Sequence, residues 1–269
     1  MSITIREMFD LTDQVAVITG GARHFGYDMA DVLAEAGCHL VITSRQLAQA
    51  EAAAEKLRAA HQRDVLPLGV DVTDAAQVRA LAERALTFKG RVDILINNAG
   101  GSPGPGASLF GRKPEEIQEL LAVNLLGTIY CCQEFGRIMV NQRRGKIINI
   151  ASIAGLIGRD RRMYERVGMR GQPVDYAAAK GGIIGLTRDV AAVLAPFGVH
   201  VNCISPGGFA RENVPPDFIK AYSDRTPLGR MGRQGSADLK GPVLFLASRA
   251  SDYMVGHNLV VDGGFSIWQ

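Results

Sequence analysis

Several features are scarce in this chain, and each scarcity excludes a class of protein. The four cysteines show no CxxC spacing and lie in apolar surroundings, so we expect reduced core residues rather than disulfides. No apolar run approaches the length that spans a bilayer, and the first ten residues, MSITIREMFD, lack the pattern of a signal peptide. The formal net charge of +3 is too small to favour nucleic acid or an anionic membrane as the main partner. We therefore expect a soluble, cytoplasmic protein.

Two kinds of catalytic centre also lack their sequence patterns. The five histidines are scattered, with neither paired helical spacing nor Cys/His spacing, so no metal site is predicted. No serine lies in a GxSxG sequence, which argues against a hydrolase nucleophile.

The chain does contain an alternation of short β-rich runs and longer helical stretches. The strand candidates are continuous apolar runs, as expected where both faces of a sheet are covered, at residues 14–19, 39–43, 65–70, 93–97, 146–150, 200–204 and 259–261. Helices are expected at 46–62, 75–88, around 114–142 and at 173–194. This order predicts an α/β fold, a Rossmann-type doubly wound parallel sheet of about seven strands with helices on both faces, formed as a single domain by residues 1–269.

Two segments interrupt the alternation. Residues 100–111, GGSPGPGASLFG, are rich in Gly, Pro and Ser and are predicted to form a loop. A second loop is predicted at 158–173, which carries five arginines and little apolar periodicity. Both follow strands, so both should emerge at the carboxyl edge of the sheet, where open α/β sheets bind ligands.

Two short motifs suggest chemistry at that edge. The first predicted strand runs into TGGARHFG at residues 19–26, where a glycine turn and a helix N-terminus can accept a pyrophosphate. Tyr176 and Lys180 lie one helical turn apart, so the ammonium can lie near the phenol and lower its pKa. A tyrosine of that kind can give and take a proton near neutral pH.

The motifs together resemble the short-chain dehydrogenase/reductase family over roughly residues 11–265. The glycine segment is similar to the family's TGxxxGxG, and NNAG occupies residues 97–100. The catalytic tetrad of the family is matched by Asn124, Ser152, Tyr176 and Lys180. The resemblance implies that the cofactor contacts are Gly20, Arg23, His24, Phe25, Gly26, Ser44, Arg45, Asp71, Val72, Asn98, Ala99, Gly100, Tyr176, Lys180, Pro206, Gly207 and Phe209.

The resemblance also implies a role for each member of the tetrad. Ser152 hydrogen-bonds the substrate oxygen, and Tyr176 gives or takes its proton. Lys180 holds the nicotinamide ribose and lowers the pKa of Tyr176, aided by the positive charge of oxidised nicotinamide. Asn124 bends or hydrates its helix so that water can relay protons toward Lys180. A hydride that reaches a carbonyl carbon leaves an alkoxide, which needs such a proton and such donors.

Two positions depart from the family pattern. His24 stands where the middle glycine is usual, and it either touches the cofactor or points away from it. Arg211 stands where a threonine usually helps to hold the nicotinamide carboxamide, so that contact is in doubt. Arg211 could instead meet a cofactor phosphate or an anionic substrate.

The end of the second predicted strand bears on the choice of cofactor. Enzymes of this kind that use NAD usually place an aspartate there, whereas this chain has Ser44 followed by Arg45. With Arg23 nearby, these guanidiniums favour a 2′-phosphate and hence NADP(H), while NAD(H) remains possible. The alternative is that Arg45 simply begins a helix in solvent.

The substrate is suggested by the arginine-rich segment. Ser152 and Tyr176 are separated by 23 residues, about twice the gap usual in the family. Guanidiniums in this segment suit a carboxylate or phosphate, and TPLGRMG at 226–232 also resembles the sugar- and gluconate-type dehydrogenases of the family. The alternative is a solvated face or a contact between subunits. By resemblance, residues 208–232 hold a lid, with 215–225 as its helical part, and the assembly is a homotetramer or, next, a dimer.

The sequence therefore predicts an oxidoreductase that transfers a hydride between NADP(H) and a secondary alcohol or ketone, with a sugar or sugar acid as the candidate substrate. Within enzymes, the alternative is a 3-oxoacyl- or steroid-type ketone reductase, although such apolar substrates favour an apolar lid. The alternative of another class is a non-catalytic dinucleotide-binding sensor or scaffold, which would have no need of a proton relay.

Overall fold

The computed structural model describes residues 3–101, 109–212 and 214–268. A parallel seven-stranded sheet lies at its centre, with the strand order β3-β2-β1-β4-β5-β6-β9. Its strands are β1 (Val15–Ile18), β2 (His39–Ser44), β3 (Val65–Gly69), β4 (Ile94–Asn97), β5 (Gly145–Ile150), β6 (Val199–Pro206) and β9 (Asn258–Val261). The order reverses between β1 and β4, as in a doubly wound fold, so the predicted fold class is confirmed.

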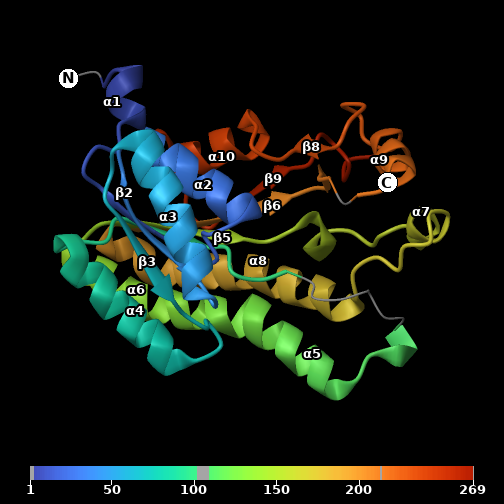
Figure 1. Cartoon of the computed structure of the whole chain (residues 1–269), viewed down its shortest axis with the longest axis horizontal. Helices are drawn as coiled ribbons and strands as arrows, with labels where there is room; N and C mark the ends of the chain where they lie inside the picture. The colour runs from blue at the N-terminus through green and yellow to red at the C-terminus, as the bar shows by residue number, and fades with distance from the viewer. Residues whose placement is uncertain (1–2, 102–108, 213, 269) are drawn as a thin grey trace.

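Helices cover both faces of this sheet (Figure 1). One face packs on α2 (His24–Glu35), α3 (Leu47–His61) and α10 (Ala237–Ala247), and the other on α4 (Ala75–Lys89), α6 (Gly127–Gln142) and α8 (Val174–Leu194). In β1, Ala16 and Ile18 join the first core and Val15 and Val17 join the second. Successive side chains point to opposite faces, so a strand buried on both faces is apolar at every position, as the sequence indicated.

The predicted helix at 114–142 is confirmed in its bounds, but a π-helical turn interrupts its α-helical hydrogen bonding. Helix α5 (Pro114–Leu121) passes into a π-helical segment, Ala122–Leu126, and then into α6. The side chain of Asn124 donates to the Leu120 carbonyl at 3.0 Å, and a side chain that enters the helical ladder in this way is a known cause of a break.

The arginine-rich segment also differs from the predicted loop, because part of it is helical. Asp160 caps α7 (Arg161–Glu165) by accepting from the N–H of Arg162 at 3.0 Å. The helix buries Met163 against α9 (Pro216–Ser223), which lies with it at one end of the molecule (Figure 1). The isolated apolar residues among the arginines therefore form one buried side.

Shorter elements complete the fold. They are α1 (Ile5–Phe9), the 3-10 turns Leu109–Gly111, Ile153–Gly155, Ala195–Phe197 and Arg249–Ser251, and a two-stranded sheet of β7 (Phe209–Ala210) and β8 (Gly232–Arg233). Of the predicted loop at 100–111, residues 102–108 lie outside the described residues, as does position 213 of the predicted lid.

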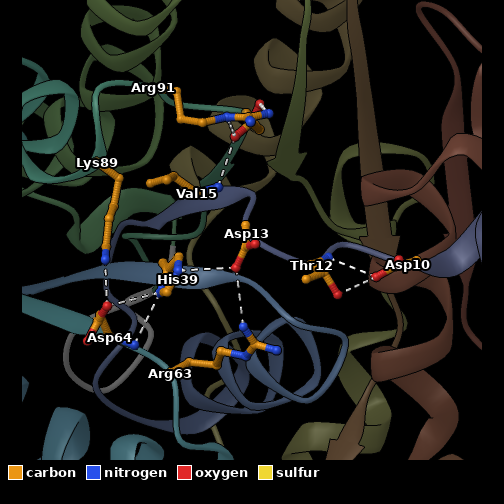
Figure 2. Close-up of polar contacts among 10 residues, drawn as sticks. Asp10, Thr12, Asp13, Val15, His39, Arg63, Asp64, Lys89 and Arg91 are labelled. Carbon is orange, nitrogen blue, oxygen red and sulfur yellow. Dashed lines mark hydrogen bonds and ion pairs between the residues drawn. The ribbon is translucent and has the colours of Figure 1, made fainter.

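The amino-terminal edge of the sheet is closed by polar contacts (Figure 2). Asp64, just before β3, pairs with Lys89 at the end of α4, and its backbone N–H donates to His39 at 3.2 Å. Asp93, just before β4, accepts from the N–H of Val15 at 2.9 Å. These contacts fix the strand starts to one another, and leave the opposite, carboxyl edge as the place for a ligand.

All four cysteines are free and buried, as predicted. Across the described ranges, none of the helices combines the length and the apolar character required to cross a bilayer.

Candidate active site

A cavity of about 1460 Å³ opens along the carboxyl edge of the sheet. Its volume exceeds the roughly 300–1,000 Å³ of an ordinary small-molecule pocket, so it has room for a dinucleotide beside a second ligand. The structure brings together every residue predicted for the site, because this cavity is lined by Gly20, Arg23, His24, Phe25, Gly26, Ser44, Arg45, Asp71, Val72, Asn98, Ala99, Gly100, Asn124, Ser152, Tyr176, Lys180, Pro206, Gly207, Phe209 and Arg211.

The glycine turn after β1 is tied to the end of β4 by hydrogen bonds. The Asn98 carboxamide donates to the carbonyls of Thr19 and Gly20 at 2.9 and 3.0 Å. In return, the Thr19 hydroxyl accepts from the backbone N–H groups of Asn98 and Ala99, both at 3.0 Å. Thr19 was not among the predicted site residues, although its place at a strand end just before the glycines is a usable signal.

Gly26 lies where a side chain has no room. A Cβ at this position would collide with the Gly20 carbonyl and lie 2.7 Å from the Asn98 amide nitrogen. The turn can therefore close only around a glycine, which leaves a backbone cradle at the N-terminus of α2. Such a cradle fits a diphosphate.

We expect Gly26→Ala to open this turn. The variant should bind NADPH at least about tenfold more weakly and lose stability, because the Gly20 carbonyl must move. The matched control is Gly241→Ala in α10, where a Cβ meets nothing within 4 Å; it should gain about 0.4–1 kcal/mol of stability. NADPH fluorescence titration measures the affinity of each variant, and urea unfolding measures its stability. An unchanged NADPH affinity in Gly26→Ala would contradict the cradle.

The end of β2 presents cations to the cavity. Ser44 is half-buried, Arg45 and Arg23 are exposed, and neither arginine forms an ion pair within the described ranges. A ribose carrying a 2′-phosphate would meet two free guanidiniums here and no aspartate.

The two departures from the family pattern lie close to each other. His24 has a φ of 49°, in the left-handed region that favours glycine, so it adopts the backbone conformation of the residue it replaces. Burial, together with the positive charges of Arg211 and Arg23, lowers the pKa of His24. The Arg211 guanidinium lies 5.1 Å from the ring centroid of Phe25, which packs edge-on against Phe209 at 4.7 Å. Arg211 thus packs on the aromatic face of Phe25 in the first turn of α2.

Ser152, Tyr176 and Lys180 lie together in the cavity, where Ser152 hydrogen-bonds the Tyr176 hydroxyl. The Lys180 ammonium donates to the Ile150 carbonyl at 2.8 Å and lies 5.7 Å from the centroid of the Tyr176 ring. Tyr176 and Lys180 are only 8% and 5% exposed. Ser152 follows β5 and caps the 3-10 turn Ile153–Gly155, with its hydroxyl accepting from the N–H of Ala154 at 3.1 Å.

The prediction that Lys180 lowers the pKa of Tyr176 is wrong for the protein by itself. Burial raises the pKa of Tyr176, and the effects that oppose it are a hydrogen bond with Ser152 and the charges of Arg159 and Arg211. The physical reason is that Lys180 is buried too, which lowers its own pKa to about 8, so the amine has lost its charge before the pH at which the Tyr176 phenol ionises.

Asn124 is fixed by the chain that follows β4. It is 1% exposed, and its carboxamide exchanges two hydrogen bonds with the backbone of Gly101, donating at 2.8 Å and accepting at 2.9 Å. Its second N–H is used by the Leu120 carbonyl. Asn124 therefore orders the backbone beside Gly100, and a role in relaying protons remains a prediction.

Another part of the cavity is lined by apolar residues, most of them in the predicted loop 158–173 and lid 208–232, that were not predicted individually. Helix α7, helix α9 and the C-terminal segment contribute an apolar wall, in which Tyr222 stacks on Phe265 at 4.2 Å and Tyr164 meets Phe218 at 4.9 Å. Further members of this wall are Ile153, Met163, Met169, Val214 and Met231. Arg159 and Gln172 lie at its border.

The lowered pKa of Lys180 has a consequence for stability. The unfolded side chain titrates near 10.5 and the folded one at about 8, so between these values the folded protein binds fewer protons. Its contribution to the free energy of unfolding then rises with pH, by at most about 1.4 kcal/mol per pH unit.

We therefore expect the free energy of unfolding of the wild type, relative to that of Lys180→Met, to rise between about pH 8 and about pH 10. Below that window the difference between the two proteins should stay constant. Urea unfolding at several pH values measures it, with exposed Lys56→Met as the baseline. A difference that does not change with pH would show that the ammonium is not buried.

No groups of metal-ligating side chains that could hold an ion occur among the described residues.

Comparison with known proteins agrees with this geometry. A family model described as enoyl-(acyl carrier protein) reductase matches residues 20–266. The chain is 36% identical over 267 residues to 2-dehydro-3-deoxy-D-gluconate 5-dehydrogenase of Dickeya dadantii, covering 97% of this chain and 98% of that protein. It is 34% identical over 256 residues to a 3-oxoacyl-(acyl-carrier-protein) reductase of Homo sapiens, covering 95% and 99%.

A solved structure gives the same result. The gluconate 5-dehydrogenase from Burkholderia cenocepacia J2315, in complex with NADP and tartrate, has a TM-score of 0.87 and 34% sequence identity to this chain, covering 98% of this chain and 99% of that chain. With the family model matching more than nine-tenths of the sequence, the chain belongs to the short-chain dehydrogenase/reductase family, oxidoreductases that act on CH–OH and C=O groups with NAD(P).

Proposed function

We propose that this protein uses NADP(H) to interconvert a secondary alcohol and a ketone, with Tyr176 as the general acid and base. The observation that carries the proposal is that the buried Tyr176 and Lys180 and the half-buried Ser152 share one cavity with a glycine cradle and the cationic end of β2. A dinucleotide cradle alone suits a sensor. A buried phenol beside a hydroxyl and an amine suits proton transfer.

The protein's part of the reaction follows from these positions. A bound nicotinamide supplies or accepts the hydride. Ser152 donates to the substrate oxygen, and Tyr176 gives its proton to the alkoxide that develops there. Lys180, already fixed by the Ile150 carbonyl, has further N–H groups for a ribose hydroxyl and for the proton path. Its pKa of about 8 lets it lose and regain a proton near neutral pH.

The predicted preference for NADP(H) is supported by Arg45 and Arg23. Both are exposed at the cavity, and neither makes an ion pair among the residues described, so both are available to a 2′-phosphate. The Burkholderia relative was solved with NADP, which agrees with this assignment.

Arg45→Ala should weaken NADPH binding by about tenfold, because a charge-assisted hydrogen bond to the 2′-phosphate is lost. NADH binding should hardly change, since NADH lacks that phosphate. Fluorescence titration with both cofactors measures the ratio, and Arg84→Ala, an exposed arginine on α4, is the control. Equal losses for NADPH and NADH would contradict the assignment.

Gluconate-type sugar acids are the leading substrate candidates. The Dickeya relative is named for a deoxy sugar acid, and the Burkholderia structure holds tartrate, a dicarboxylate. The 3-oxoacyl type is the second candidate, favoured by the apolar wall of Met163, Phe218 and Phe265. Helix α7 contributes Met163 to this wall, so the arginine-rich segment is compatible with an apolar substrate as well.

Tyr176→Phe separates an enzyme from a sensor. Loss of the hydroxyl should reduce turnover of any ketone that the wild type reduces by about 10²–10⁴-fold while NADPH still binds. Tyr253→Phe removes the same atom from a fully exposed ring and should leave turnover unchanged. Turnover is followed by NADPH absorbance and binding by fluorescence. A Tyr176→Phe protein with wild-type turnover would overturn the proposed mechanism.

Three further features belong to the proposal. Residues 208–232, with α9, act as a lid over the apolar wall, since α9 buries Phe218 and Tyr222 against it. The protein works in the cytoplasm as a homotetramer, in which α6 and α8 contact other subunits. Exposed apolar side chains such as Leu126 and Val193 on this side of the fold support such contacts.

A further inference from the structure

Arg170 lines the cavity from an exposed position, but Arg159 differs from the other arginines of its segment. It is half-buried at the cavity, and its guanidinium donates to the Gln172 side-chain oxygen at 2.7 Å and to the Pro173 carbonyl at 3.1 Å. Both acceptors are neutral. Within the described part of the chain no carboxylate lies within 4.0 Å of it, and its Nε–H has no acceptor. Burial and the charge of Arg161 lower the pKa of Arg159, as expected for a cation without a counter-charge.

The alternative that the arginines form a salt-bridged face holds for Arg162. Its side chain is 75% exposed and pairs with Asp160 at 2.9 Å, and Arg225 contacts the same carboxylate. Arg161 donates to the Gln172 carbonyl. The segment is therefore divided: one arginine is paired in solvent, while Arg159 is turned into the cavity with no carboxylate partner.

Arg211 is a second cation of this kind. It lines the cavity, lies over the Phe25 ring, and has no ion pair within residues 3–101, 109–212 and 214–268. The charges of Arg159 and Arg211 are the two that act on the Tyr176 hydroxyl, lowering its pKa against the effect of burial. Both cations therefore lie within electrostatic range of the atom that handles the proton.

A half-buried guanidinium without a carboxylate is costly, and a planar anion that accepts its free N–H groups removes that cost. We propose that Arg159, together with Arg211, binds a carboxylate of the substrate itself, so that this cavity selects anionic ketones and alcohols over neutral ones. The inference rests on the proposed function and deepens it by naming the group that the substrate must carry.

The remainder of the cavity agrees with this assignment. The wall next to Arg159 is built mainly of methionine and aromatic side chains, and the Tyr222 hydroxyl accepts from the Gly208 N–H at 2.6 Å, which leaves its O–H as a donor. An uncharged substrate would find few polar partners there, whereas an acid is oriented by one strong contact. Orientation of this kind places the reacting carbonyl at Tyr176.

The test is calorimetric binding to the NADP⁺-saturated protein, which does not depend on turnover. Levulinate and 5-ketogluconate are each compared with their methyl ester. The wild type should bind at least one acid about ten- to a hundredfold more tightly than its ester. Arg159→Gln and Arg211→Gln should remove that preference, and Arg159→Lys should retain part of it. Arg162→Gln, in the same segment but outside the cavity lining, should leave it unchanged.

The proposal is overturned if neither acid binds more tightly than its ester, or if Arg159→Gln keeps the preference while its melting temperature shows a folded protein. A loss of NADPH affinity in Arg159→Gln would place the guanidinium on the cofactor diphosphate and overturn it as well. Turnover is scored separately. If the protein reduces neutral ketones but shows no preference for acids, the proposed oxidoreductase function holds and the carboxylate site is contradicted. If it prefers acids in binding but reduces none of them, the carboxylate site holds and the proposed function is contradicted.

Discussion

The buried Lys180 ammonium is the constraint around which the rest of the site is arranged. A cation with 5% exposure needs acceptors that cannot move, and the Ile150 carbonyl at the end of β5 provides one. That contact joins α8 to the end of β5, and Tyr176, one turn earlier on α8, lines the cavity. Burial also brings the pKa of Lys180 down to about 8, so the lysine has the character of a proton carrier as well as a charge.

The two edges of the sheet divide structural and functional tasks. At the amino-terminal edge, ion pairs and hydrogen bonds around Asp64 and Asp93 join the strand starts directly to each other. At the carboxyl edge, backbone groups are held by Asn98 and Asn124, whose carboxamides order the loops after β1 and β4. The ion pairs that join the strand starts thus lie away from the cavity, and polar side chains that line the cavity are available to bind a ligand.

The sequence predicted the fold well, because strands that are buried on both faces are mostly apolar, and β1, with the sequence VAVI, is apolar at every position. It also predicted which residues meet in the cavity, since parallel strands bring their carboxyl ends to one edge. It did not predict the acidity of Tyr176. That quantity depends on how deeply the ring and Lys180 are buried together, which a four-residue spacing does not reveal.

The arginine-rich segment shows a second limit of reading the sequence. The five arginines of the segment 158–173 cannot be told apart from the sequence, yet Arg162 pairs with Asp160 in solvent while Arg159 lines the cavity. The difference comes from the start of α7 at its cap Asp160: Arg162 lies within this helix and pairs with the cap, whereas Arg159 precedes the helix and donates to Gln172 and Pro173. Such a short helix has too little periodicity to be found without the partner surface on α9.

A crystal structure with bound NADP⁺ tests the central claim most directly. The account predicts that the nicotinamide ribose lies within hydrogen-bonding distance of the Lys180 ammonium and the Tyr176 hydroxyl, with the 2′-phosphate at Arg45. A dinucleotide bound in the opposite direction, with its adenine beside Tyr176, or bound outside the cavity, would contradict it.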